Sequence, residues 1–212
     1  MMYRKNFDLS IYFIADSSVC AGRAIEDVVA AAVRGGATMV QLRNKVCTHD
    51  IVADEARRVQ SILADSNVSF IINDHVELAA DIGADGVHIG QEDMSAKEAR
   101  RIIGTDAILG LTAFTRTHYD ALDPEIIDYV GTGPFHATLT KPDKSVLGAD
   151  GFAVLAKTSP VPVVGIGGVT PENAGDVIAA GAQGVAMMRA VSEAVDPKIA
   201  ARHFVKAVEC AR

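Results

Sequence analysis

Short apolar runs alternate with amphipathic segments along the whole chain. The runs are rich in β-branched residues, as buried strands are, and the segments between them repeat apolar residues at helical spacing. Eight strands are expected, at Ser10–Ile14, Met39–Arg43, Phe70–Asn73, Gly86–Ile89, Ile108–Leu111, Tyr129–Thr132, Val161–Ile166 and Gly184–Met188. This alternation predicts an α/β fold in which residues 1–212 form a single-domain (β/α)8 TIM barrel. A doubly wound open sheet is the alternative, because periodicity alone does not separate the two.

Capping signals place several of the expected helices. Ser95 and Glu98 form a capping box, and Thr170-Pro171 combines a hydroxyl N-cap with a proline at the first helical position. The expected helices are Ile25–Arg34, Asp50–Leu63, a short one ending at Ile82, one from Ser95 to Gly104, two short ones near His118–Leu122 and Gly151–Lys157, one from Thr170 to about Ala180, and Pro197–Ala211.

A glycine pair follows the seventh expected strand. Gly167-Gly168 precedes the Thr170 helix start, and bare glycines let an anion approach the backbone near a helix N-terminus. In (β/α)8 barrels a phosphate site often forms after the last two strands. The pair therefore predicts a phosphate site, with a simple tight turn as the alternative.

Composition narrows the functional class. The formal net charge is −7 and 49% of the residues are hydrophobic, which argues against nonspecific nucleic-acid binding. Three widely spaced cysteines favour neither a disulfide framework nor a zinc site. No apolar run has the length of a signal or transmembrane segment, so we expect a cytoplasmic protein without a membrane partner. A homo-oligomer is possible, and the sequence leaves the oligomeric state open.

Polar residues gather where the second strand ends. Gln41, Arg43 and Lys45 alternate, so they share one direction. Two cations and an amide aimed into a barrel are costly unless an anionic ligand meets them. The alternative is a solvated strand end with Arg43 paired to a carboxylate.

Carboxylates follow the third and fourth strands. Asn73-Asp74 and Asp93 lie past the ends of neighbouring strands, so the two carboxylates are expected to converge. Mg²⁺ typically binds one or two carboxylates together with substrate phosphate oxygens. Helix capping by Asp74 and a loop role for Asp93 are the alternatives. His88 lies within the fourth strand and is either a packed core residue or a ligand contact.

Hydroxyls and one more cation complete the set of candidates. Thr112 ends the fifth strand, and a long loop after the sixth carries Thr138, Thr140 and Lys141. The set provides room for two phosphorylated groups, one with Mg²⁺ and the cations and the other on the glycine pair. A reaction that joins two phosphorylated small molecules and releases diphosphate is therefore expected.

Six motifs follow one another along the chain: Gln41–Lys45, Asn73-Asp74, His88–Asp93, Asp128–Gly131, Thr138–Lys141, and Gly165–Gly168 with Gly184–Ala186. Taken together, they resemble the thiamine-phosphate synthase family over roughly Ile11 to Val191. The resemblance implies a (β/α)8 barrel that joins hydroxymethylpyrimidine diphosphate to a thiazole phosphate and releases diphosphate.

The resemblance also implies roles for individual residues. Gln41 would contact the pyrimidine, and Asp74 and Asp93 would bind Mg²⁺. Arg43, Lys45, Asn73 and Lys141 would hold the diphosphate, and Thr138, Thr140, Gly167 and Gly168 the thiazole phosphate. Lys141, Arg43 and Thr112 are the candidate catalytic residues, and Thr112, Met188 and Arg189 are added as substrate contacts.

The chain departs from the family at four positions. Asn44 stands where the family usually has an acidic residue, Thr112 where it often has serine, and Phe114 where it often has histidine. Arg189 stands where the family has a small serine that meets the thiazole phosphate. Arg189 could supply a charged contact, block the pocket or serve another anion.

Three alternatives remain open. A thiazole tautomerase-like isomerase would share the barrel, with His136 as a candidate acid or base, but would not need Arg43, Lys45 and the carboxylate pair together. A sugar-phosphate isomerase or epimerase would not explain the cationic second strand. A noncatalytic phosphate-ligand binder would bind without turnover.

Overall fold

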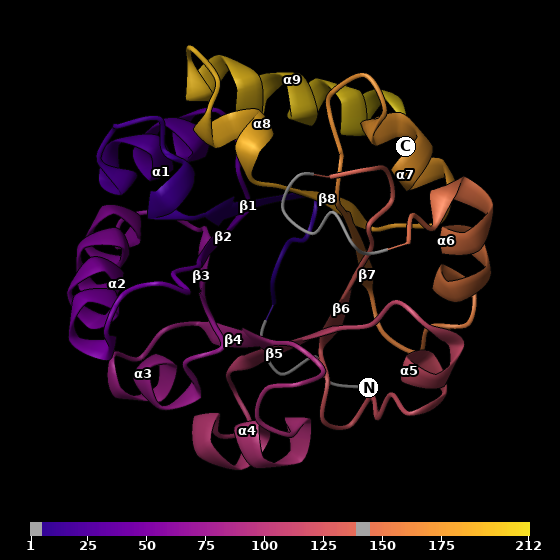
Figure 1. Ribbon diagram of the computed structural model, residues 1–212, viewed down its shortest axis with the longest axis horizontal. Coiled ribbons are helices and arrows are strands. Elements are labelled where there is room, and N and C mark those ends of the chain that lie inside the picture. Colours follow the sequence, from indigo (N-terminus) through magenta and orange to yellow (C-terminus); the bar gives the residue numbers. More distant parts are fainter. Residues whose placement is uncertain (1–5, 139–144) are drawn as a thin grey trace.

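A closed barrel of eight parallel strands forms the centre of the computed structural model, which describes residues 6–138 and 145–212 (Figure 1). The barrel runs in chain order, and β8 pairs with β1 to close it. The strands are β1 (Ile11–Ala15), β2 (Met39–Leu42), β3 (Ser69–Asn73), β4 (Gly86–Ile89), β5 (Ile108–Thr112), β6 (Tyr129–Thr132), β7 (Val163–Ile166) and β8 (Gly184–Met187). The expected (β/α)8 barrel is confirmed, and the open sheet is excluded.

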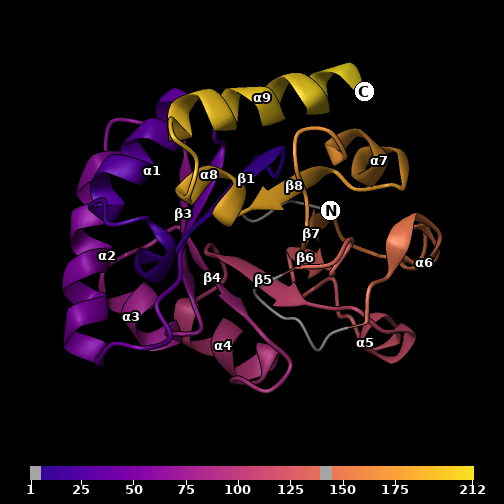
Figure 2. The ribbon, with the colours of Figure 1, turned by 45° about the horizontal axis from the view of Figure 1, so that its top comes forward.

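Helices surround the barrel (Figures 1 and 2). They are the 3₁₀ helix η1 (Ser17–Val19) and the α-helices α1 (Ile25–Arg34), α2 (His49–Leu63), α3 (Val76–Asp81), α4 (Ala96–Ile103), α5 (Arg116–Asp120), α6 (Gly148–Ala156), α7 (Ala174–Ala179), α8 (Arg189–Ser192) and α9 (Pro197–Cys210). The Ser95 cap is confirmed, because its side chain accepts a hydrogen bond from the Glu98 amide. α9 packs against α1, α7 and α8.

Two apolar layers form the core. The larger one fills the space between the strands and the helices. The smaller one fills the barrel interior, where side chains from alternating strand positions meet; its buried members are Leu9, Tyr12, Ile14, Met39, Ile71, Ile108, Tyr129, Val164 and Ala186. These side chains pack the barrel interior, and a cavity remains at the carboxyl ends of the strands.

Helix starts differ most from the sequence prediction. The prediction that Thr170-Pro171 begins a helix is wrong, because α7 begins at Ala174 after an Asn173 N-cap. The Asn173 side chain accepts a hydrogen bond from the Thr170 amide, which holds residues 170–173 in a turn instead. α8, a single turn that starts at Arg189, was not predicted.

Smaller shifts have local causes. α6 begins at Gly148, three residues before the predicted start, and α5 begins at Arg116 behind a Thr115 cap. β7 begins at Val163, after Pro162, which lacks the amide hydrogen that a central strand needs. No helix among the described residues is long and apolar enough to span a membrane.

Candidate active site

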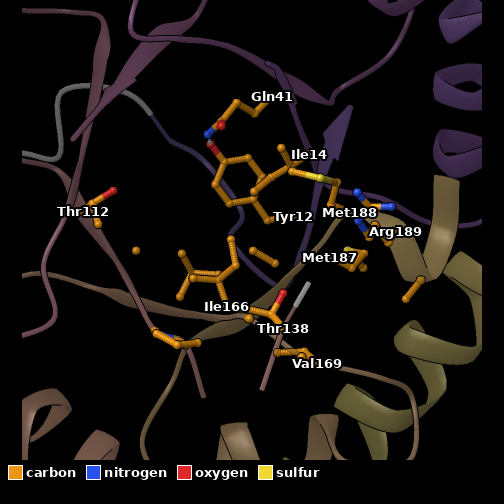
Figure 3. A pocket seen from close by; sticks show the side chains of 18 of the residues that line it. Tyr12, Ile14, Gln41, Thr112, Thr138, Ile166, Val169, Met187, Met188 and Arg189 are labelled. Carbon is orange, nitrogen blue, oxygen red and sulfur yellow. Dashed lines mark hydrogen bonds between the residues drawn. The ribbon is translucent and has the colours of Figure 1, made fainter. Parts of the chain in front are cut away.

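A cavity of about 330 Å³ opens at the carboxyl ends of the strands (Figure 3). Nine of the predicted site residues line it: Gln41, Arg43, Asn73, Thr112, Thr138, Gly167, Gly168, Met188 and Arg189. Thr112 and Arg189 lie on opposite sides, and aliphatic side chains such as Ile14, Ile166 and Val169 lie between the polar groups. A cavity of this kind suits a ligand with an apolar body and polar ends.

Arg43 stands at the mouth and is held by a carboxylate. Its Nη1 contacts Oδ2 of Asp16, which is only 4% exposed. The other Asp16 oxygen accepts hydrogen bonds from the Ser18 amide at 3.0 Å and the Ser18 hydroxyl at 2.5 Å. Arg43 is therefore paired with a carboxylate, as the alternative interpretation of this strand end predicted. It also lines the cavity, so its guanidinium is held in one orientation and can still contact a ligand.

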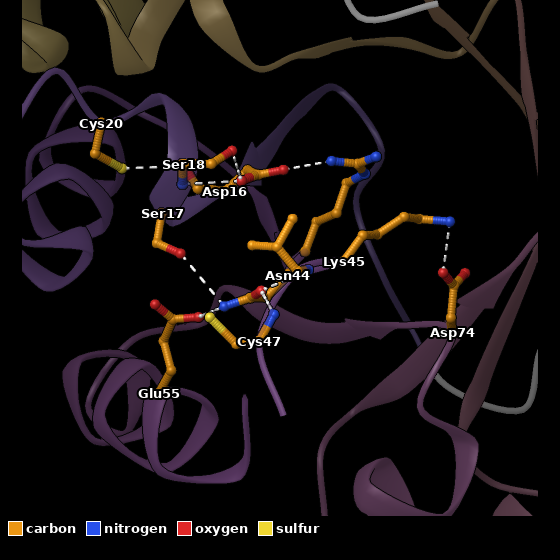
Figure 4. Close-up of polar contacts among 11 residues, drawn as sticks. Asp16, Ser17, Ser18, Cys20, Asn44, Lys45, Cys47, Glu55 and Asp74 are labelled. Carbon is orange, nitrogen blue, oxygen red and sulfur yellow. Dashed lines mark hydrogen bonds and ion pairs between the residues drawn. The ribbon is translucent and has the colours of Figure 1, made fainter. Parts of the chain in front are cut away.

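Lys45 and Asp74 form an ion pair beside the cavity (Figure 4). The Lys45 Nζ lies 2.8 Å from Asp74 Oδ2, and neither residue belongs to the cavity lining. Asp74 has a φ of 65°, a left-handed conformation that aspartate tolerates better than most residues. This turn in the backbone follows β3 directly, which places the carboxylate at the strand's end.

Asp93 also lies outside the cavity lining. Its Oδ2 accepts a hydrogen bond of 2.7 Å from the Gly90 amide in the β4–α4 loop. Within residues 6–138 and 145–212, no three His, Cys, Asp or Glu side chains form a group that can hold a metal ion. Two carboxylates such as Asp74 and Asp93 have the oxygen chemistry that Mg²⁺ needs, provided that a substrate supplies further oxygen ligands.

Asn73 contributes a buried donor. It is 8% exposed, and its Nδ2 has no hydrogen-bond partner among the described residues. A buried donor without a partner is costly, and ligand oxygens are the natural acceptors at a cavity wall. This observation supports the predicted contact between Asn73 and an anion.

Buried polar side chains connect Gln41 to Thr112 across the cavity floor. Gln41 Nε2 donates to the Tyr12 hydroxyl at 2.6 Å, and that hydroxyl lies 2.7 Å from the Tyr129 hydroxyl. His88 Nδ1 lies 3.0 Å from the Tyr129 hydroxyl, and His88 Nε2 lies 3.0 Å from Thr112 Oγ1. His88 therefore points inward, and it is a cavity residue as well as a packed one.

Gly167 and Gly168 line the cavity with positive φ values of 92° and 65°. A Cβ on Gly167 would lie 2.7 Å from Pro134 Cα, and one on Gly168 would lie 2.5 Å from the Ala137 carbonyl oxygen. Glycine is thus required by the backbone conformation and by the loop packed against it. The predicted helix start beside the pair is absent, because α7 begins six residues after Gly168.

Arg189 begins α8 and lines the cavity next to Met188. Its Nη1 pairs with Glu193 Oε1 one turn later, and its Nε is buried without a partner among the described residues. The side chain is 38% exposed. Arg189 therefore brings a guanidinium to the side of the cavity that holds the glycine pair.

Other predicted residues lie outside the cavity lining or outside the residues that the structure describes. Thr140 and Lys141 fall in the segment 139–144, outside the described residues. His136 is not among the described lining residues, whereas Phe114 is. Asn44 points away from the cavity toward α2, where its Nδ2 donates to Glu55 Oε2 at 3.1 Å.

Sequence reasoning missed several residues that shape the site. Asp16 directly follows β1 and orients Arg43, but its partner lies 27 positions along the chain. Tyr12 and Tyr129 have the large apolar rings of core residues. Their hydroxyls take part in the hydrogen bonds of the cavity floor because both side chains point into the barrel. Asn173 donates to the Gly168 carbonyl at 3.0 Å. An asparagine three residues after Thr170 was a possible signal for that turn.

Comparison with known proteins assigns the chain to one enzyme family. A family profile described as thiamine monophosphate synthase matches residues 11–191. The chain is 42% identical over 207 residues to thiamine-phosphate synthase of Azorhizobium caulinodans, covering 97% of this chain and 98% of that one. It is 43% identical over 204 residues to that of Bacillus velezensis, covering 92% and 89%.

A solved structure shows the same architecture. Thiamine phosphate pyrophosphorylase from Pyrococcus furiosus superposes with a TM-score of 0.87 at 28% identity, covering 96% of each chain. The matched region contains every described cavity residue named above, from Tyr12 to Arg189. The chain belongs to the thiamine monophosphate synthase family and is an enzyme of thiamine biosynthesis.

Proposed function

We propose that the protein joins hydroxymethylpyrimidine diphosphate to a thiazole phosphate in a Mg²⁺-dependent reaction. The bond between the pyrimidine methylene carbon and the diphosphate oxygen breaks, and diphosphate leaves with the bonding electrons. The thiazole ring nitrogen then supplies the electron pair for a new bond to that methylene carbon, which gives thiamine phosphate. We expect the reaction to take place in the cytoplasm.

The observation that carries the proposal is the arrangement of groups around one cavity. Arg43 and Asn73 stand at the ends of β2 and β3, the glycine pair and Arg189 follow β7 and β8, and aliphatic side chains such as Ile14 and Ile166 line the same cavity. Two phosphorylated substrates need two anion sites and an apolar space in which their rings meet. The match of the family over residues 11–191 supports the same assignment.

The proposed reaction gives each predicted site residue a role. Gln41 and Thr112 contact the pyrimidine. Arg43, Lys45, Asn73 and Lys141 hold the diphosphate, and Arg43 and Lys141 stabilise its developing charge. Thr138, Thr140, Gly167, Gly168 and Arg189 hold the thiazole phosphate, beside Met188. The apolar wall keeps water away from the electron-poor methylene carbon.

Asp74 and Asp93 would hold the metal. Bound Mg²⁺ would neutralise charge on the departing diphosphate. Lys45 Nζ lies 2.8 Å from Asp74 Oδ2, so a cation for the diphosphate stands next to one of the carboxylates that would hold the metal.

Diphosphate release is the direct test. Purified protein is given the two substrates together and singly, with and without Mg²⁺, and thiamine phosphate is identified by its mass. Release that needs both substrates and the metal supports the proposal. Saturable binding of thiazole phosphate without release would instead favour the noncatalytic or tautomerase-like alternative.

Variants separate the metal assignment from the rest. Asp93→Ala should abolish Mg²⁺-dependent turnover with an unchanged circular dichroism spectrum, because the side chain lies in the β4–α4 loop and not in the core. Asp106→Ala is a matched control, since Asp106 is an exposed loop carboxylate before β5. Full activity of Asp93→Ala would contradict the metal assignment.

A further inference from the structure

The side-chain hydrogen bonds on the cavity floor have a direction. An amide nitrogen only donates, so Tyr12 accepts from Gln41 Nε2. The Tyr12 hydroxyl then directs its single proton to Tyr129, its other partner, because a buried proton left without an acceptor is costly. The Tyr129 hydroxyl, having accepted that bond, donates in turn to His88 Nδ1.

The direction assigns a tautomer to His88. Because Nδ1 accepts, a neutral imidazole carries its proton on Nε2, and that N–H donates to Thr112 Oγ1. The Thr112 hydroxyl proton is then left to point into the cavity that Thr112 lines. At the other end, Gln41 Oε1 accepts no hydrogen bond from any described residue.

The barrel makes room for this network with two glycines. A Cβ on Gly110 would lie 2.2 Å from Tyr129 Cζ and 2.5 Å from His88 Nδ1. A Cβ on Gly131 would lie 3.2 Å from His88 Cε1. Both glycines are in strands and neither has a positive φ, so the space taken by the His88–Tyr129 bond is what requires glycine there.

The hydroxyl protons persist over the ordinary pH range. Burial raises the pKa of both Tyr12 and Tyr129 well above the usual tyrosine value. Both phenols therefore stay protonated wherever the enzyme is folded and working, and each can donate to the next member of the network.

We infer that Tyr12, Tyr129 and His88 are positioning residues that hold Gln41 as an acceptor and Thr112 as a donor toward the ligand. This inference rests on the proposed function and specifies one of its subsites. The ring that binds must present an N–H donor to Gln41 Oε1 and an acceptor to the Thr112 hydroxyl. An aminopyrimidine does so with its exocyclic amine and a ring nitrogen, whereas an oxopyrimidine reverses the polarity.

The tautomer can be measured without any assumption about activity. Long-range nitrogen–proton NMR spectra of the ¹⁵N-histidine-labelled protein, at mildly alkaline pH, distinguish the two neutral forms. The His88 signal is identified by its absence in His88→Gln. We expect the Nε2–H form, and a mixture of forms in Tyr129→Phe. An Nδ1–H form in the native protein would reverse the direction and overturn the inference.

Kinetics test the consequence for substrate binding. Tyr129→Phe removes the central hydroxyl, and Tyr119→Phe is its matched control, because Tyr119 loses an equally buried bond of 2.6 Å to Thr132 outside the cavity. We expect Tyr129→Phe to lower kcat/KM for the pyrimidine diphosphate about 10- to 100-fold, and to leave KM for the thiazole phosphate unchanged. Tyr119→Phe should change neither by more than about twofold.

Analogue binding gives a second readout. Native protein should bind the 4-amino pyrimidine diphosphate at least about 100-fold more tightly than its 4-oxo analogue, and Tyr129→Phe should reduce that ratio. If Tyr129→Phe and Tyr119→Phe lower Tm alike and neither alters pyrimidine kinetics or the ratio, the network is only structural and the inference is wrong. If native protein shows the Nε2–H tautomer and the analogue preference but no diphosphate release, the proposed function fails and the inference stands.

Discussion

Asp16 is the residue whose part in the site depends most on its neighbours. It is 4% exposed, it accepts two hydrogen bonds from Ser18, and its second oxygen holds Arg43. A fixed guanidinium loses less conformational freedom when it binds a phosphate oxygen. In the proposed reaction, the carboxylate would therefore orient Arg43 for the diphosphate.

Asp16→Asn should weaken this orientation of Arg43. We expect kcat/KM for the pyrimidine diphosphate to fall about 10-fold or more, mostly through KM, because the neutral amide holds the guanidinium less firmly. Asp54→Asn is the matched control, since Asp54 pairs with Arg57 at 3.2 Å on the exposed face of α2. Exposed pairs contribute little, so equal kinetic losses in the two variants would contradict this role.

Arg189 adds a cation where the glycine pair lines the cavity. Arg189→Ser should raise KM for the thiazole phosphate about 10-fold through loss of a charge-assisted hydrogen bond, with kcat within about twofold. Glu193→Gln frees the guanidinium from its ion pair and should keep or lower that KM. A lower KM in Arg189→Ser would mean that the side chain crowds the pocket instead.

Cys20 should resist alkylation, unlike the other two cysteines. Burial raises the pKa of its thiol to about 11, and Asp16 adds to the shift. Cys47 and Cys210 are exposed. At mildly alkaline pH, maleimide should modify two thiols quickly and the third only after unfolding, as counted by mass. Fast modification of all three thiols would contradict the burial of Cys20.

The raised pKa of Cys20 also makes the stability depend on pH. The free energy of unfolding should fall once the pH exceeds the pKa of this thiol in the unfolded chain, because the unfolded thiol then loses its proton more readily than the folded one.

Residues at strand ends were predictable from the sequence because position and chemistry coincide there. Gln41, Asn73 and Thr112 are polar, they end or follow apolar runs, and all three line the cavity. Asp16 also follows a strand, but its pairing is set by a contact 27 residues away that no local pattern encodes. The inward register of Tyr12 depends likewise on barrel closure.

Strands were easier to locate than helix starts. β4 and β6 coincide with their predictions, since β-branched and aromatic residues bounded by glycine or aspartate mark short buried strands. α7 and α8 are the failures. Thr170-Pro171 has the local chemistry of a helix start, but tertiary contacts from Asn173 to Gly168 and Thr170 favour a turn.

The turn between β7 and α7 should therefore depend on Asn173. Its Oδ1 accepts from the Thr170 amide at 2.8 Å, and its Nδ2 donates to the Gly168 carbonyl at 3.0 Å. Asn173→Ala should lower the free energy of unfolding by about 1–2 kcal/mol and raise KM for the thiazole phosphate, because the glycine pair loses its support.

Asn173→Asp separates the two bonds. It keeps the acceptor toward Thr170 and loses the donor toward Gly168. We expect denaturant melts to show a smaller loss of stability than for Asn173→Ala, together with a similar rise in KM. Unchanged KM in both variants would show that the turn does not position the phosphate site.

At the scale of the whole molecule, the site exists because the barrel closes. Gln41, His88 and Tyr129 come from β2, β4 and β6, and the cavity floor forms only when β8 reaches β1. The apolar periodicity predicted eight strands, but by itself it did not separate a closed barrel from an open sheet. It also did not predict which interior side chains meet, because that depends on the stagger between strands.

Closure depends on one close approach at Gly184, the first residue of β8. A Cβ there would lie 1.8 Å from the Leu9 carbonyl oxygen and 2.8 Å from Ser10 Cα, both of which are backbone atoms that cannot rotate away. Gly184→Ala should therefore force β8 from the segment that leads into β1. We expect a loss of about 2–3 kcal/mol in the free energy of unfolding, or a Tm lower by about 5–10 °C.

Gly175→Ala is the matched control for this substitution. Gly175 lies in α7, and its added Cβ would meet only Ala211 Cβ at 3.8 Å, an ordinary contact. Alanine favours a helix more than glycine does, so Tm should stay equal or rise. Because β8 leads directly into Met188 and Arg189, Gly184→Ala should also raise KM for the thiazole phosphate more than KM for the pyrimidine diphosphate. Equal Tm values in the two variants would show that β8 and β1 tolerate separation, and that closure is not what holds this side of the cavity.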